Sequence, residues 1–201
     1  MIRLKQYLFS LKNVGQGLKL VLALVLALLP GCGGVVDQFR NAEMDFGSIQ
    51  TVAVMPLPNL SKDSLASDRV RDVFIASLLA TGGMYVLPPG EVARGIAGAG
   101  IANPTAPTTD ETIKLCKQLK VDGLITGTVR EYGEVRSGST SANVISMSMQ
   151  LFEGQTGKVV WSATSTQGGI GVTDRLFGGG GESMNNVTEK AVNDLINKFF
   201  K

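Results

Sequence analysis

The spacing of hydrophobic residues changes several times along the chain, and each change predicts a change of secondary structure. Within residues 49–57, the run 52–55 (VAVM) is apolar at odd and even positions alike, which is typical of a strand buried on both faces. Apolar and polar residues alternate over 143–152, which indicates a half-buried antiparallel strand. Apolar residues recur at spacings of three and four over 64–79 and over 184–199, which indicates amphipathic helices.

Shorter signals predict the remaining elements. Thr108 and Glu111 have the spacing of a capping box and open a helix. Residues 153–157 are turn formers between two strand patterns and predict a hairpin. The result is the order β-α-β-α-α-β-β-β-α, with strands at 49–57, 84–87, 124–134, 143–152 and 158–167 and helices at 64–79, 91–96, 108–119 and 184–199. We therefore expect one α+β domain with a mixed sheet of about five strands, packed on one face by helices.

The first 31 residues have a different character from the rest. Four basic residues and no acidic residue precede the apolar stretch 20–29, which is followed by Gly31 and Cys32. Charge, length and the small residue at the end are typical of a secretory signal. The uninterrupted run is about half of the roughly 20 residues that a membrane-spanning helix needs, so a permanent transmembrane anchor is the weaker interpretation.

The position of the cysteine makes this signal more specific. A signal that ends at a cysteine resembles the bacterial lipoprotein signal, in which the thiol is acylated and the chain is cut just before it. The resemblance implies cleavage between Gly31 and Cys32 and fatty acids such as palmitate on Cys32, with an ordinary signal peptide or a retained anchor as alternatives. It gives three segments: 1–31 as signal peptide, 32–47 as acylated N-terminus and short tether, and 48–201 as the domain. Gly33 after the cysteine agrees with sorting to the outer membrane, with the domain facing the periplasm.

Composition excludes several classes of function. The signal holds four of the 19 Lys and Arg residues and none of the 17 Asp and Glu residues, so the remaining chain is slightly acidic and offers no electrostatic basis for nucleic-acid binding. The absence of histidine excludes Ser-His-Asp and Cys-His nucleophiles and histidine-ligated metals. After the glycines at 178–181, Glu182 stands where a phosphate-binding loop needs lysine, which argues against a nucleotide. We expect no cofactor, no metal and no enzymatic activity.

Other reactive or bulky side chains favour structural roles. Cys116 lies on the apolar face of its predicted helix, where a buried, inert thiol is expected. The carboxylates form no obvious acid and base pair, and turn or solvated positions are expected for Asp122, Glu131, Glu134 and Glu153. Tyr132 and Trp161 are candidates for binding a partner, although packing in the core or on the sheet is the favoured interpretation.

Three motifs together resemble a known group of proteins. Residues 51–59 (TVAVMPLPN) resemble a first-strand motif, 122–129 (DGLITGTV) resemble an inner-strand motif, and 156–161 (TGKVVW) resemble a hairpin motif. This set is similar to that of the curli secretion lipoprotein CsgG, the penicillin-binding-protein activator LpoB and the N-terminal domain of TolB. The resemblance implies an envelope lipoprotein with an α+β domain over most of the mature chain.

The resemblance specifies a function less closely, because the members of this group do different work on one scaffold. We expect a non-enzymatic outer-membrane lipoprotein that binds another envelope protein or itself in support of an assembly or secretion system. An alternative is a subunit of a CsgG-like oligomeric export channel or of its periplasmic collar. An enzyme acting on peptidoglycan, or an activator of a peptidoglycan synthase, is a weaker alternative.

Overall fold

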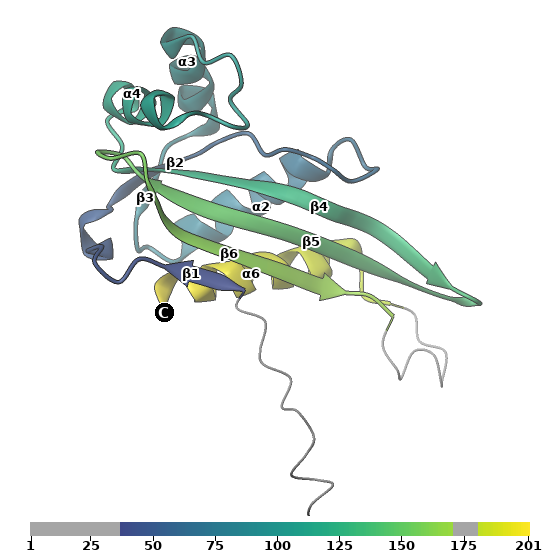
Figure 1. Cartoon of the computed structure of the whole chain (residues 1–201). Helices are drawn as coiled ribbons and strands as arrows, with labels where there is room; N and C mark the ends of the chain where they lie inside the picture. The colour runs from purple at the N-terminus through teal and green to yellow at the C-terminus, as the bar shows by residue number, and fades with distance from the viewer. Residues whose placement is uncertain (1–36, 171–180) are drawn as a thin grey trace, which may run out of the picture. The chain divides into compact units, whose positions relative to one another are not determined.

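One sheet runs through the computed structural model, which describes residues 37–170 and 181–201. The elements follow in the order β1 (Gln38–Arg40), η1 (Phe46–Ser48), β2 (Thr51–Val54), α2 (Ala66–Ala80), β3 (Tyr85–Val86), α3 (Pro89–Ala99), α4 (Thr109–Leu119), β4 (Gly123–Ser137), β5 (Thr140–Glu153), β6 (Val159–Gly168) and α6 (Met184–Phe200). The strands lie in the spatial order β1-β6-β5-β4-β2-β3 (Figure 1). Strand β2 is parallel to β3 and β4, whereas β4, β5, β6 and β1 pair antiparallel, so the predicted mixed sheet is confirmed.

Helices lie on both faces of the sheet and form two cores, so the expectation of helices on one face is wrong. Val52, Val54 and Ile125 belong to a core shared with α2 and α6. Ala53 and Leu124, which alternate with them along the same strands, belong to a second core shared with α3 and α4. Because successive side chains of a strand point to opposite faces, the two helix pairs cover opposite faces. The consecutive apolar residues of the first predicted strand are therefore explained by burial on both sides.

Local sequence signals fix the helix ends. Thr108 accepts a hydrogen bond from the backbone N–H of Glu111, and the Glu111 carboxylate accepts one from the backbone N–H of Thr108, so the predicted capping box is confirmed. Helix α4 ends at Lys120, whose φ of 56° lies in the left-handed region. Ser183 caps α6 by accepting a hydrogen bond from the N–H of Asn186.

Strands β4 and β5 form a hairpin longer than the sequence predicts. Residues 135–142, between the predicted strands 124–134 and 143–152, are mostly strand, because only Gly138 and Ser139 separate β4 from β5. Gly138 has a φ of 62°, a conformation that glycine adopts without strain. A β-bulge at Arg130 shifts the register between Val129 and Glu131.

The sixth strand is the main difference from the predicted fold. Residues 32–47 are expected to form a tether, yet Gln38–Arg40 form β1, which pairs antiparallel with β6. Tertiary contacts hold this strand: Gln38 Nε2 donates to the carbonyl of Lys198 at 2.8 Å, and Arg40 Nη1 donates to the carbonyl of Phe199 at 2.6 Å. Three residues give no periodicity to detect, so a sequence pattern cannot reveal β1. Among the described helices, none has the length and apolar character needed to cross a membrane.

Candidate interaction surface

Helices α3 and α4 cover only part of their face of the sheet. They pack at β2 and at the beginning of β4 and leave the rest of that face of the sheet uncovered by helices (Figure 1). The uncovered part presents polar side chains from β4, β5 and β6. The register brings these side chains together across the strands, because Thr126 lies opposite Gln150 and Thr128 opposite Ser148. We call this surface the polar face, and it consists of Thr126, Thr128, Ser146, Ser148, Gln150, Ser162, Thr164 and Thr166.

The polar face carries mostly hydroxyl and amide groups, and its charged residues, Arg130 and Glu131, lie at its border, where Glu131 is opposite Ser146. Thr166 Oγ1 and Ser146 Oγ lie 3.1 Å apart and form a cross-strand hydrogen bond. A cavity of about 430 Å³ lies between this face and the loop Thr105–Pro107, with Arg130 at its border. Such a surface can donate and accept hydrogen bonds in many directions, as the polar parts of protein interfaces do.

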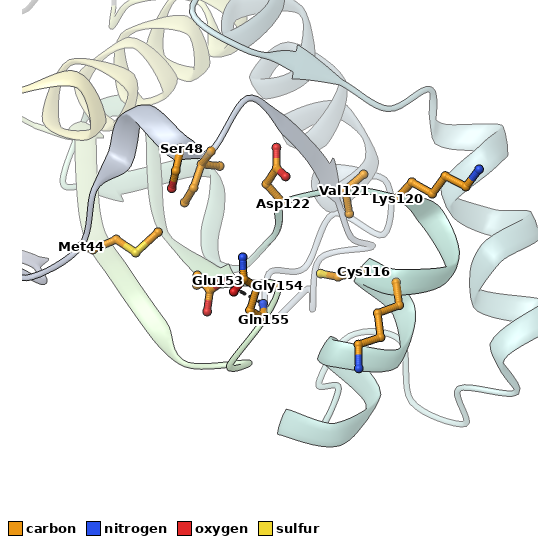
Figure 2. Close-up of a pocket in the computed structure, with 11 residues that line it drawn as sticks. Met44, Ser48, Cys116, Lys120, Val121, Asp122, Glu153, Gly154 and Gln155 are labelled. Carbon is orange, nitrogen blue, oxygen red and sulfur yellow. Dashed lines mark hydrogen bonds between the residues drawn. The ribbon is translucent and has the colours of Figure 1, made fainter.

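A second cavity, of about 660 Å³, lies where α4, the β5–β6 turn and the segment Met44–Ile49 meet (Figure 2). Its acidic groups already serve as acceptors for the backbone. The Asp122 carboxylate accepts hydrogen bonds from the N–H groups of Gln50 at 3.0 Å and Thr51 at 2.8 Å. The Asp122 carboxylate at the wall of this cavity therefore holds the start of β2 in place and stabilises the fold.

Glu153 has the same role at the other wall of this cavity. Its carboxylate accepts hydrogen bonds from the N–H groups of Gln155 and Thr156, both at 2.8 Å, and from the Thr156 hydroxyl at 2.6 Å. Burial by itself raises the pKa of Glu153, but the hydrogen bonds from Thr156 and Gln155 outweigh burial and hold the pKa below its usual value. Glu153 is therefore the predicted turn residue, although it is only 9% exposed and not solvated.

The thiol of Cys116 faces the same cavity and is chemically inert. Burial, followed by the negative charges of Glu153 and Asp122, raises its pKa to about 12. Cys116 is 3% exposed, and a protonated thiol at this depth is neither a nucleophile nor a metal ligand. The expected buried, inert cysteine is confirmed.

The structure places the two aromatic candidates for partner binding differently. Trp161 is 1% exposed and packs edge to face against Phe199, with ring centroids 5.1 Å apart. It is a core residue, as the favoured interpretation expects. Tyr132 is partly buried, packs against the same core and also lines a cavity with Leu60. Tyr132 and Trp161 lie at different places in the sheet, and a partner-binding role for either stays a prediction.

Two further predicted features lie near or beyond the limits of the described residues. Gly31 and Cys32, the expected cleavage and acylation site, lie outside the described residues, as do residues 171–180 of the glycine-rich segment. Glu182, which argued against a phosphate site, forms an ion pair with Lys190 of α6. Among the described residues, no group of three or more Cys, Asp or Glu side chains is arranged to hold a metal ion.

Sequence reasoning found one row of the polar face and missed the surface as a whole. The alternation over 143–152 identifies Ser146, Ser148 and Gln150 as residues of one face. It does not reveal which side chains of β4 and β6 lie beside them, because that depends on strand register. Thr126, Thr128, Ser162 and Thr164 join the surface only through the pairing of the strands.

Comparisons with known proteins agree with this architecture. The structure of Lipoprotein GNA1162 from Neisseria meningitidis is 22% identical, with a TM-score of 0.53 over 75% of this chain and 97% of that chain. A PelC dodecamer from Paraburkholderia phytofirmans is 15% identical, with a TM-score of 0.54 over 80% of this chain and 95% of that chain. Both likenesses show a shared fold. The LpoB C-terminal domain from Salmonella enterica is 14% identical, with a TM-score of 0.48 over 63% of this chain and 86% of that chain.

No curated protein sequence matches the chain. The likeness to CsgG and to TolB stays a prediction from the sequence motifs. One family model, described as "Putative lipoprotein GNA1162-like", matches residues 42–198 and so spans nearly the whole described domain. The chain belongs to the GNA1162-like lipoprotein family.

Proposed function

We propose that the protein is an outer-membrane lipoprotein, anchored through acylated Cys32 with its domain in the periplasm, and that it works by binding another envelope protein or further copies of itself. The observation that carries the proposal is the family match over 42–198, directly after a signal that ends at Cys32. Catalysis is no part of the proposal, since the acidic groups of the larger cavity serve the backbone and its thiol is inert.

The position of β1 limits how far the domain extends from its anchor. Strand β1 begins at Gln38, and Asp37 before it is paired with Lys198 of α6. An extended chain gains at most about 3.5 Å per residue, so the few residues between Cys32 and β1 span no more than about 20 Å. An acylated Cys32 would therefore keep the domain next to the membrane surface, where only partners close to that surface could reach it.

The polar face is the surface we assign to protein contact. It is broad and rich in hydroxyl groups, with the charged residues Arg130 and Glu131 at its border, a composition that suits a wet protein interface better than a lipid surface. One solved structure with this fold is a dodecamer, which supports self-association as one form of the contact. The assembly or secretion system that the protein serves would then follow from the partner.

Anchorage is tested by labelling cells with a palmitate analogue and separating the two membranes on a density gradient. The intact chain should take up label and sediment with the outer membrane. Cys32→Ala should lose both the label and the membrane association. An unlabelled chain, or one that sediments with the inner membrane, would contradict the proposed anchorage.

Contact through the polar face is tested with a photoreactive residue placed at Ser148 in the full chain. After irradiation of intact cells, Ser148 should crosslink to a defined envelope protein or to further copies of the chain. The matched control carries the same residue at Asp72, an exposed position on α2. A chain that stays monomeric and captures nothing from Ser148, or that captures equally from both positions, would contradict the proposal.

A further inference from the structure

The outer edge of β4 is open over the last part of the strand. The backbone N–H of Leu60 donates to the carbonyl of Val129 at 2.8 Å, and beyond that point no described residue pairs with this edge. Arg130–Ser137 therefore project with β5 as an arm whose outer side has no neighbouring strand within 37–170 and 181–201 (Figure 1). Unpaired strand edges are templates for pairing with another strand.

The pairing pattern shows which backbone groups face outward. The carbonyl of Asn143 accepts a hydrogen bond from the N–H of Gly169, so the backbone of Asn143 faces β6. Glu134 of β4 lies opposite Asn143 of β5. Because the backbone groups of Asn143 point to β6, the two residues form a non-hydrogen-bonded pair, and the N–H and C=O of Glu134 face away from β5, toward the open edge. By the same alternation, Tyr132 and Arg136 also direct their N–H and C=O groups outward.

The edge is complementary to itself in one antiparallel register. When Val135 of one copy lies opposite Val135 of a second copy, Glu134 of each lies opposite Arg136 of the other. The outward backbone groups of these two residues then meet as hydrogen-bonded pairs. Registers centred on Glu134 or on Arg136 bring like charges together, which is unfavourable for directly opposed residues. Charge therefore selects the register centred on Val135.

Two apolar features beside the edge agree with this register. Val135 is 38% exposed, and it would meet its own copy in a non-hydrogen-bonded pair, the arrangement in which side chains approach most closely. Leu60 is 70% exposed and borders a cavity of about 400 Å³ that also includes Arg130 and Tyr132. In the register centred on Val135, the turn Gly138–Ser139 of the second copy would lie at this cavity.

We infer that two copies of this chain pair through the outer edges of their β4 strands, antiparallel and centred on Val135, to form one continuous sheet. The contact is isologous, so it closes as a two-fold dimer. Within one chain, Glu134 and Arg136 form an exposed ion pair at 2.8 Å. In the dimer, Glu134 of each copy would pair with Arg136 of the other, and such exposed ion pairs fix the register of the strands more than they add affinity. The strength of so short a contact rests on the proposed function, since anchorage in one membrane raises the effective concentration of the copies.

The test is disulfide crosslinking in membranes from cells that express the full chain. In a non-hydrogen-bonded pair the two Cα atoms lie about 4.5 Å apart, within disulfide range, so Val135→Cys should give a covalent dimer under mild oxidation. The matched control is Ser137→Cys, two residues along the same strand and also exposed. Its copies would lie about 13 Å apart at roughly 3.4 Å per residue and should not crosslink.

A charge exchange tests what fixes the register. Glu134→Arg should reduce the dimer formed through Val135→Cys, and the added Arg136→Glu should restore it. Absence of a dimer from Val135→Cys, or an equal yield from Ser137→Cys alone, would overturn the inference. Palmitate labelling and capture from Ser148 do not depend on this edge, so the proposed function would survive that result.

Discussion

Lys198 Nζ, near the end of α6, lies 2.5 Å from a carboxylate oxygen of Asp37, the residue that precedes β1. The same ammonium group donates to Asp194 at 2.8 Å and to the carbonyl of Thr164 in β6 at 2.9 Å. One side chain therefore joins the last helix, the inner strand β6 and the start of the edge strand. The contact determines where the folded domain begins, and with it the length of chain left between the domain and Cys32.

Replacing Lys198 by methionine should loosen β1 and lower the thermal unfolding midpoint. Methionine keeps most of the apolar stem, so the loss reports the charged contacts. Hydrogen exchange should show faster exchange at the Thr164 amide, which donates to the carbonyl of Asp37. Lys190→Met is the matched control on the same helix, since its ion pair with Glu182 is exposed and should contribute little. Equal effects of the two substitutions would contradict this prediction.

The same contact should depend on pH in a defined direction. The hydrogen bond from Lys198 holds the pKa of Asp37 below its usual value of 3.8, so the contribution is present above that pH and is lost as the pH falls through the lowered pKa. Burial lowers the pKa of Lys198, but Asp194 and Asp37 outweigh burial and raise it above 10.5. The stability difference between the intact chain and Lys198→Met should shrink below about pH 4, as measured by urea unfolding at several pH values.

Truncation of Trp161 should be among the most destabilising single changes in the domain. The indole is 1% exposed and packs against Phe199, so Trp161→Ala should cost about 3–5 kcal/mol of unfolding free energy. Trp161→Phe should cost less, because the indole Nε1 has no hydrogen-bond partner among the described residues and the aromatic contact is partly kept. Chemical denaturation measures both. Similar losses for the two variants would contradict the cavity argument.

Gly127 is required by the close approach of β4 and β5. A Cβ at this position would lie 2.3 Å from the carbonyl oxygen of Ser148, so Gly127→Ala should cost at least about 1–3 kcal/mol. Gly98, in the exposed part of α3, is the matched control because its Cβ would meet only the flexible end of Gln118. Gly98→Ala should be neutral or stabilising, since alanine is the better helix former. Thermal melts should show a lower midpoint for Gly127→Ala and an unchanged or higher midpoint for Gly98→Ala.

Cys116 should resist alkylation while the domain is folded. Its pKa of about 12 leaves almost no thiolate at pH 8, and 3% exposure blocks access to the sulfur. Mass spectrometry after iodoacetamide treatment should therefore find Cys116 unmodified in the native chain and modified in urea. Rapid labelling of the native protein would show that the end of α4 opens readily.

The main elements of the fold are readable from the sequence because each is a local pattern. The capping residues of α4, the periodicity of α6 and the alternation of β5 all depend on residues within a few positions of each other, and the structure confirms them. Strand β1 and the far half of β4 are not readable in this way. Gln38–Arg40 become a strand only through contacts with Lys198 and Phe199, about 160 positions away.

The candidate surfaces also differ in whether local sequence signals predict them. The signal and the acylation of Cys32 are predictions that the sequence makes by itself, because charge, hydrophobic length and one cysteine carry that information locally. The polar face needed the register of three strands, and the open edge of β4 needed the sheet order that leaves β2 and β3 too short to cover it. Pairing of side chains across strands and exposure of an edge depend on which segments meet in space.

The sequence by itself determined the succession of helices and strands, the mixed α+β class and the buried position of Cys116, and it predicts a leader that ends at Cys32. These follow from propensity, periodicity and capping, which act over a few residues. The tertiary structure alone decided that residues 38–40 form β1 within the segment predicted to be a tether, that Trp161 is enclosed and that Glu153 is buried at a turn. It also decided that eight polar side chains form one face, because burial and register depend on contacts between distant segments.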